Sequence, residues 1–73
     1  MYVYNPQPTS RKRLMRQTPC GGIVVVVTSR IGDRWETEVM GGPLDGWSLE
    51  ATDKAGADCN HDGAVALVKG ATN

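Results

Sequence analysis

Residues 34–52 read RWETEVMGGPLDGWSLEAT, and this stretch decides the fold. On both sides of its Gly/Pro-rich segment, residues 41–46, apolar or small side chains alternate with charged or polar ones. The alternating set that we expect on the buried side is Trp35, Thr37, Val39, Trp47, Leu49 and Ala51. Because successive side chains of a strand point to opposite faces of a sheet, the pattern predicts a β-hairpin with both tryptophans on one apolar face.

A run of β-branched residues precedes this hairpin. Residues 23–28 read IVVVVT, a continuous run that is typical of a strand covered on both faces, or at least paired on both edges. Gly32 and Asp33 form a turn signal that would join the run to the hairpin. We therefore expect a three-stranded antiparallel meander with strands at residues 23–29, 34–40 and 47–52.

The hydrophobic period changes after Thr52. The residues that recur at helical spacing on one stripe are Ala57, His61, Ala64 and Val68. This spacing predicts a helix that packs over the tryptophan face. Thr52 or Asp53 can cap it, although glycines inside the segment leave a start as late as Asp62 open, and Lys69 with Gly70 would end it.

The predicted architecture is α+β, with the three-stranded antiparallel meander, one C-terminal helix packed on one face, and an N-terminal arm. Residues 1–22 would form the basic arm and residues 23–73 the small domain. The expected core consists of residues 23–27 with Trp35, Val39, Trp47 and Leu49. Since a chain of 73 residues buries a small core, a partner or a second copy would be a natural source of further stability.

The arm is predicted from its prolines. Pro6, Pro8 and Pro19 interrupt any regular element nearby, and Thr9 or Ser10 could cap only a short helix over residues 11–16. Leu14 and Met15 would be the buried side chains of that helix.

Charge is segregated along the chain. Residues 1–32 hold five basic side chains and no acid, whereas the remainder holds three basic side chains and eight acids. Such asymmetry can serve association with a partner, or the basic arm can lie across its own acidic domain. The cluster Arg11, Lys12, Arg13 and Arg16 could also contact phosphate, which keeps a small DNA-binding regulator as an alternative.

Metal and cofactor chemistry finds little support in the sequence. Asp58, Asn60 and Asp62 match the opening of a calcium loop, but Lys69 stands where the closing carboxylate belongs. Cys20, Cys59 and His61 lack the paired spacing of a zinc site, so the simpler interpretation of His61 is a hydrogen-bonded helix residue. The glycine-rich segment 41–46 precedes a strand, which disfavours a phosphate loop. We predict no metal, no cofactor and no catalytic residue.

Trp35 opens a segment, WETEVMGGPLDG, that resembles a recurrent stretch in small bacteriophage and prophage proteins, especially those of actinobacteria. In those proteins a threonine, an alanine-rich helix with a histidine, and a Val/Leu-rich end follow the hairpin. Thr52, His61 and residues 64–68 keep that order here, whereas Ala55 and Gly56 depart from the usual Glu-Ala before the histidine. The resemblance covers residues 35–69 and implies phage origin and shape, without an activity to carry over.

The function expected from these observations is that of a small non-enzymatic phage accessory protein that binds a host macromolecule. An inhibitor of a defence system, such as a CRISPR effector, is the leading example, and a virion or assembly component that uses its N-terminal arm is an alternative. The residues expected to bind are Arg11, Lys12, Arg13, Arg16, Glu36, Glu38, Asp45 and Glu50. A host or viral protein is the favoured partner over nucleic acid, with self-association as a further option.

The expected location is the host cytoplasm or the virion. Two cysteines are too few for a disulfide scaffold, and no apolar run is long enough to span a membrane or to form a signal peptide.

Overall fold

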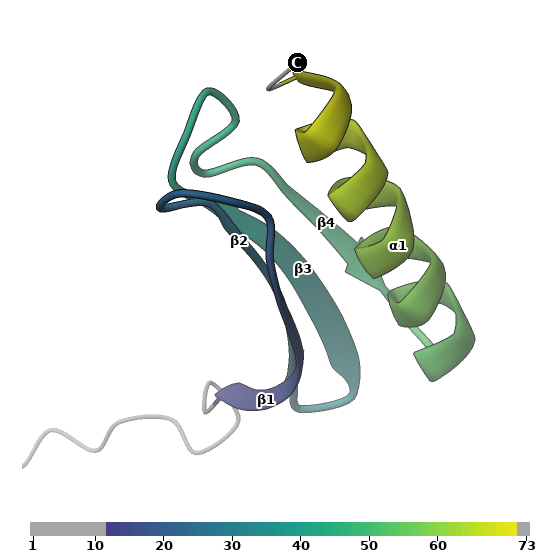
Figure 1. The fold of residues 1–73 in the computed structure, drawn as a ribbon. Coiled ribbons are helices and arrows are strands. Elements are labelled where there is room, and N and C mark those ends of the chain that lie inside the picture. The colour runs from purple at the N-terminus through teal and green to yellow at the C-terminus, as the bar shows by residue number, and fades with distance from the viewer. Residues whose placement is uncertain (1–11, 72–73) are drawn as a thin grey trace, which may run out of the picture.

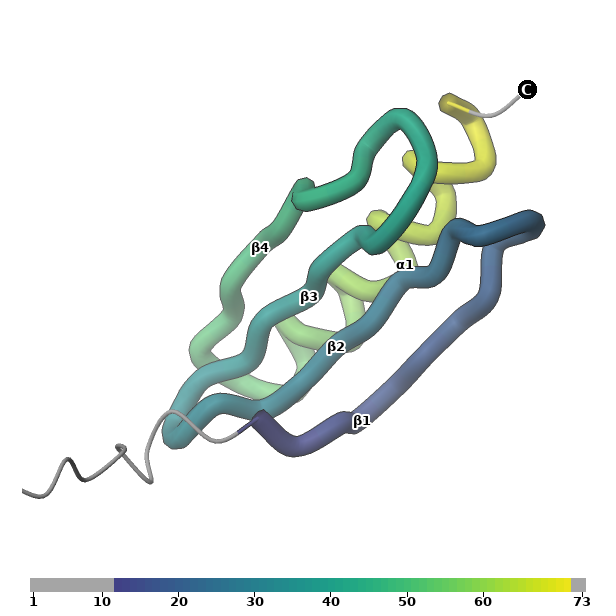
Figure 2. Tube along the Cα trace, turned by 90° about the vertical axis from the view of Figure 1, so that its left-hand side faces the viewer, coloured from purple at the N-terminus to yellow at the C-terminus, as the bar shows by residue number. Residues whose placement is uncertain are grey.

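A computed structural model describes residues 12–71 and places one helix against a single four-stranded antiparallel sheet (Figure 1). The elements are β1 (Lys12–Pro19), β2 (Val25–Ile31), β3 (Arg34–Met40), β4 (Ser48–Ala51) and α1 (Lys54–Ala71). The strands lie side by side in chain order, β1-β2-β3-β4. Figure 2 looks onto the sheet from the side opposite α1, so the two layers lie one behind the other. The predicted α+β class with a C-terminal helix is confirmed.

The hairpin of residues 34–52 forms as predicted. β3 pairs antiparallel with β4, and Trp35 lies opposite Ala51. Beyond the ladder, the Val39 amide donates to the Trp47 carbonyl at 2.8 Å and the Gly46 amide donates to the Val39 carbonyl at 2.8 Å. Trp47 therefore lies opposite Val39, and the alternation of β3 places both tryptophans on the side of the sheet that faces α1.

The predicted N-terminal arm is wrong for residues 12–22. These residues form β1 and the turn into β2, so the sheet has four strands and no short helix forms over residues 12–16. Gly21 and Gly22 have φ of +99° and +58° in the turn that reverses the chain. The Cys20 backbone amide donates to the Val24 carbonyl at 2.8 Å. Pro19 is accommodated because it sits at the end of an edge strand. Arg11, with residues 1–10, lies outside the described residues.

β2 accordingly lies between β1 and β3 and is paired on both edges, as the IVVVVT run predicts. The ladder between β1 and β2 shifts register between Leu14 and Arg16, where Met15 has no partner. Such a bulge bends an edge strand and increases its local twist.

The core lies between α1 and the sheet. Its fully or nearly buried apolar members are Val24, Val26, Val39, Ala64 and Val68, with Cys20, Leu44, Trp47 and Val65 packed against them. The predicted helical stripe of Ala57, His61, Ala64 and Val68 is the buried face of α1. Two expected core residues are instead exposed. Ile23 precedes β2 in the turn and is 83% exposed, and Leu49 lies on the short edge strand β4 and is 40% exposed.

α1 begins where one of the two expected caps places it, and it ends one residue later than expected. Asp53 caps the helix, because its carboxylate accepts from the Gly56 amide at 2.6 Å. The helix therefore begins at Lys54, well before Asp62, and it continues past Gly70 to Ala71. Burial of the stripe outweighs the cost of about 1 kcal/mol that each internal glycine carries relative to alanine.

The loop between β3 and β4 packs against the turn that precedes β2. Gly41 has a φ of +86°, and a Cβ at this position would lie 2.5 Å from the Ile23 carbonyl oxygen. The Gly41 amide also donates to the Asp45 carboxylate at 2.7 Å. Glycine is thus required at residue 41 by both backbone conformation and close approach.

Replacing Gly41 by alanine is expected to cost about 2–4 kcal/mol of unfolding free energy, from positive φ combined with the contact to Ile23. Gly46 provides the matched control, because its φ of +90° is similar while a Cβ there would meet open space. Gly46→Ala should cost only about 1–2 kcal/mol. Denaturant unfolding of the two variants measures the difference, and equal losses would show that the loop does not press on residue 23.

Candidate functional site

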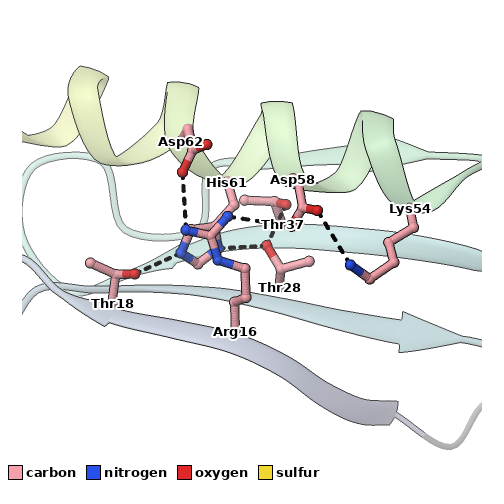
Figure 3. A network of polar contacts seen from close by, with 8 residues as sticks. All are labelled: Arg16, Thr18, Thr28, Thr37, Lys54, Asp58, His61 and Asp62. Carbon is pink, nitrogen blue, oxygen red and sulfur yellow. Dashed lines mark hydrogen bonds and ion pairs between the residues drawn. The ribbon is translucent and has the colours of Figure 1, made fainter.

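Each side of the sheet carries one polar arrangement, and the first is a buried network between α1 and the sheet (Figure 3). His61 is fully buried. Its Nδ1 atom lies 2.7 Å from Thr28 Oγ1 and its Nε2 atom lies 2.8 Å from Thr18 Oγ1. Thr28 Oγ1 also lies 2.7 Å from Thr37 Oγ1. His61 thus connects α1 to β1 and β2 directly, and to β3 through one more hydroxyl.

The network is satisfied when His61 is neutral. A neutral imidazole has one donor and one acceptor nitrogen, and each threonine hydroxyl can supply the complementary group. Burial lowers the pKa of His61, and the nearby positive charge of Arg16 lowers it further, while Asp62 and Asp58 act in the opposite direction. The predicted interpretation of His61 as a hydrogen-bonded helix residue is confirmed.

Arg16 of β1 forms ion pairs with α1 beside this network. Its guanidinium donates to Asp62 at 3.0 Å and to Asp58 at 3.4 Å, on successive turns of α1. Lys54 reaches Asp58 from the preceding turn at 3.5 Å. The positive charge of Arg16 is therefore used to hold β1 against the acidic helix, which is the self-docking alternative for the basic cluster.

The contact between Thr28 and His61 has the geometry of a hydroxyl beside a base, but it offers no route for a substrate. Both residues are fully buried beneath α1. A nucleophile must reach its substrate, so we assign the network a structural role.

The partial match to a calcium loop at Asp58, Asn60 and Asp62 does not correspond to a loop in the structure. Asp58, Asn60 and Asp62 all lie inside α1, so they form no loop that could surround a cation. The carboxylates turn to Arg16, and the Asn60 amide donates to the Glu50 carbonyl at 3.3 Å. Within residues 12–71, no three His, Cys, Asp or Glu side chains are grouped so that they could hold a metal ion.

The second arrangement is the sheet face that α1 leaves uncovered, here called the open face (Figure 2). The strand registers place its members, because the side chains that alternate with the buried ones point away from α1. These members are Lys12, Leu14, Gln17, Pro19, Val25, Val27, Ser29, Ile31, Arg34, Glu36, Glu38, Met40, Ser48 and Glu50. The apolar members lie mainly on β1 and β2, and the acidic members lie on β3 and β4.

The apolar half of the open face is accessible. Leu14 is 61% exposed and Met40 is 46% exposed. Val25, Val27 and Ile31 are half-buried by their neighbours in the sheet, and no element of the described chain lies over them. β2 is therefore apolar on both faces but covered on one.

The charged half gathers four of the residues predicted to bind. Glu36 lies directly opposite Glu50. Lys12 Nζ lies 3.1 Å from Glu36 Oε1 and 3.7 Å from Glu38 Oε1. The hydrogen bond that Lys12 donates to Glu36 raises the pKa of Lys12. Arg34 donates to Glu50 at 3.1 Å.

The other predicted binding residues lie elsewhere. Arg13 lies opposite Arg30 in the ladder between β1 and β2, on the side of the sheet that faces α1. Arg16 forms ion pairs with Asp58 and Asp62 beside the buried network, and Asp45 accepts a hydrogen bond from the Gly41 amide. Arg11 is outside the described residues. The prediction also missed Leu14, which it placed in a short helix. The continuous apolar run of β2 was the available signal for an apolar second face.

A surface depression and the character of the helix complete the description. An open depression of about 570 Å³ borders the charged half, lined by Arg34, Glu50, Ala51, Thr52, Asp53, Gly56 and Asn60. In the described part of the chain, no helix is both long and apolar enough to cross a membrane.

The lowered pKa of His61 predicts a pH effect on stability. Above its ordinary value of 6.5 the imidazole is neutral in both states, and the network contributes fully. Below that pH the unfolded chain binds the proton more readily than the folded chain, so the free energy of unfolding should fall. Denaturant unfolding at pH 7.5 and 5.5 measures the loss, and His61→Gln should reduce it. An equal loss in both proteins would assign the effect to other groups.

The threonines of the network should differ in importance. Thr28→Val leaves His61 Nδ1 and the Thr37 hydroxyl without their partner in a fully buried place, so we expect a loss of about 1–3 kcal/mol. Thr18→Val should cost less, because Thr18 is only half-buried and water can replace its hydroxyl. Thermal and denaturant unfolding would give the order, and the reverse order would contradict the network.

Comparisons of this chain with protein-family models, with curated proteins and with solved structures found no match. The resemblance of residues 35–69 to small phage proteins therefore stays a prediction. Function must be inferred from the geometry of the two faces.

Proposed function

We propose that this chain is a small non-enzymatic binding protein that docks its open face on a host protein. The supporting observation is β2, whose Val25, Val27 and Ile31 form a second apolar face over which the described chain places no element. A strand of this composition is ordinarily covered on both sides. Uncovered apolar side chains rimmed by charges are typical of interaction surfaces.

The edges of the sheet are less suitable for docking than its open face. β1 carries Lys12, Arg13, a bulge and Pro19, all of which hinder the addition of another strand. β4 has only four residues, and Asn60 of α1 already binds the Glu50 carbonyl. Docking through the open face is thus favoured over docking through an edge.

The DNA-binding alternative loses support because two members of the basic cluster, Lys12 and Arg16, are engaged in ion pairs. Lys12 pairs with Glu36 and Glu38, and Arg16 pairs with Asp58 and Asp62. A phosphate would have to compete with these carboxylates on an acidic surface. The virion alternative relied on a long arm, and β1 removes residues 12–19 from that arm.

The class of partner follows from the resemblance and from the charges. A phage accessory protein in the host cytoplasm would meet defence or growth proteins, and the acidic half of the open face suits a basic surface such as a nucleic-acid channel. An effector of a CRISPR system is one protein of this class.

Leu14→Asp tests the proposal. We expect it to weaken capture of the partner from host lysate at least about tenfold, since it introduces a charge into the apolar half of the face. Leu67→Asp is the matched control, because Leu67 is also an exposed apolar residue, at 43%, but lies on α1. Quantitative affinity capture with both variants, followed by titration of the purified partner, provides the measurement.

Both substitutions are at exposed positions and should alter stability by no more than about 0.5 kcal/mol, which circular dichroism can verify. If Leu14→Asp binds like the parent chain, or if only Leu67→Asp fails, the open face is not the binding surface.

A further inference from the structure

The open face is divided lengthwise into halves of different chemistry. β1 and β2 present the apolar half, with Leu14, Val27 and Ile31, whereas β3 and β4 present Glu36, Glu38 and Glu50. Because the division runs along the strands, a complementary occupant has to carry an apolar stripe with a parallel charged stripe beside it.

The charged half favours a cation from the partner. Glu36 and Glu50 are direct cross-strand neighbours, and like charges directly opposite each other destabilise a sheet. Lys12 is shared between Glu36 and Glu38, so within residues 12–71 two cations, Lys12 and Arg34, pair with three carboxylates on this face. A guanidinium placed over Glu36 and Glu50 would relieve the repulsion and could bind a carboxylate through two parallel hydrogen bonds.

The shape of the sheet favours a helix. α1 shows that this twisted sheet accepts a helix running along its strands (Figure 1). Layers of helix, sheet and helix are a stable architecture, and an extended segment would need an edge that β1 and β4 do not offer. β2 and β3 have seven residues each, and at about 3.3 Å per residue they span roughly 23 Å, the length of about 15 helical residues.

We infer that the open face receives a cationic amphipathic helix of the partner protein. Its apolar stripe packs over the β1–β2 half, and its arginine or lysine side chains contact Glu36, Glu38 and Glu50. This inference rests on the proposed function, because it specifies which protein segment occupies the same face.

The probe is a synthetic helical peptide of about 16 residues, with leucines along one stripe and arginines along the neighbouring stripe. A peptide of the same composition, but with the two residue types shuffled so that no stripe forms, is the control. We expect the amphipathic peptide to bind the full chain at least about tenfold more tightly by calorimetry, and to shift the amide resonances of β1 to β4. Resonances of the outer side of α1 should stay unchanged.

A matched pair of variants isolates the charged half. The double substitution Glu36→Gln and Glu50→Gln should weaken peptide binding at least about tenfold and reduce its salt dependence. Asp33→Asn, in the exposed turn between β2 and β3, removes a charge outside the face and should leave affinity unchanged. Amide spectra of the free variants show whether each retains the fold.

Three outcomes would overturn the inference: equal affinity for the shuffled peptide, resonance shifts on α1 in place of the sheet, or full affinity in the double variant. Sedimentation that reveals a dimer of the parent chain, lost in Leu14→Asp, would overturn both the inference and the proposed function, since a second copy would then be the occupant of the open face. The three peptide outcomes leave the proposed function standing, because Leu14→Asp and Leu67→Asp test it separately by partner capture.

Discussion

The burial of one imidazole against three threonines is the constraint on which the structure depends. His61 is the largest fully buried side chain of the described residues, and it can be buried only where hydroxyls satisfy both ring nitrogens. Thr28 and Thr18 supply those hydroxyls from β2 and β1, and Thr37 completes the network from β3. Apolar contacts between valines would tolerate some sliding or rotation of α1, whereas hydrogen bonds do not. The network therefore fixes which side of α1 faces inward and where the helix lies along the strands.

Fixing α1 in this way determines what the other side of the sheet can do. A chain of this size provides one helix in its described part, and that helix is committed to the face with the threonines. The run of valines at the start of β2 nevertheless places apolar side chains on both faces, with Val24 and Val26 under α1 and Val25 and Val27 on the open face. The inner face of the sheet, under α1, has a polar network at its centre. The outer face, which is the open face, is apolar with acidic residues along one side. The inner face specifies the fold, and the proposed function assigns association to the outer face.

Local patterns predicted the elements in which one signal dominates. The alternation of residues 34–52 gave the hairpin and the common side of its tryptophans, and the spacing of Ala57 and His61 gave the buried stripe of α1. β1 was missed because Pro19, a bulge at Met15 and a dense group of cations mask its strand pattern, and because its pairing with β2 is a tertiary effect. The open face could have been foreseen only in part. The run in β2 indicated two apolar faces, but the number of covering elements is a property of the whole fold.

An accessible apolar half raises the question of how the free chain avoids nonspecific association, and the ion pairs along its border give an answer. Lys12 reaches across from β1 to Glu36 and Glu38, and Arg34 pairs with Glu50, so charged side chains flank the apolar strip. Exposed pairs of this kind contribute only about 0–1 kcal/mol each, so a partner can rearrange them at small cost. In the proposed complex, a cation of the partner would replace Lys12 and Arg34 at these carboxylates. The charged side chains that limit nonspecific association of the free chain can thus become contacts in the proposed complex. A permanent apolar layer over the open face would prevent association but could not also bind a partner.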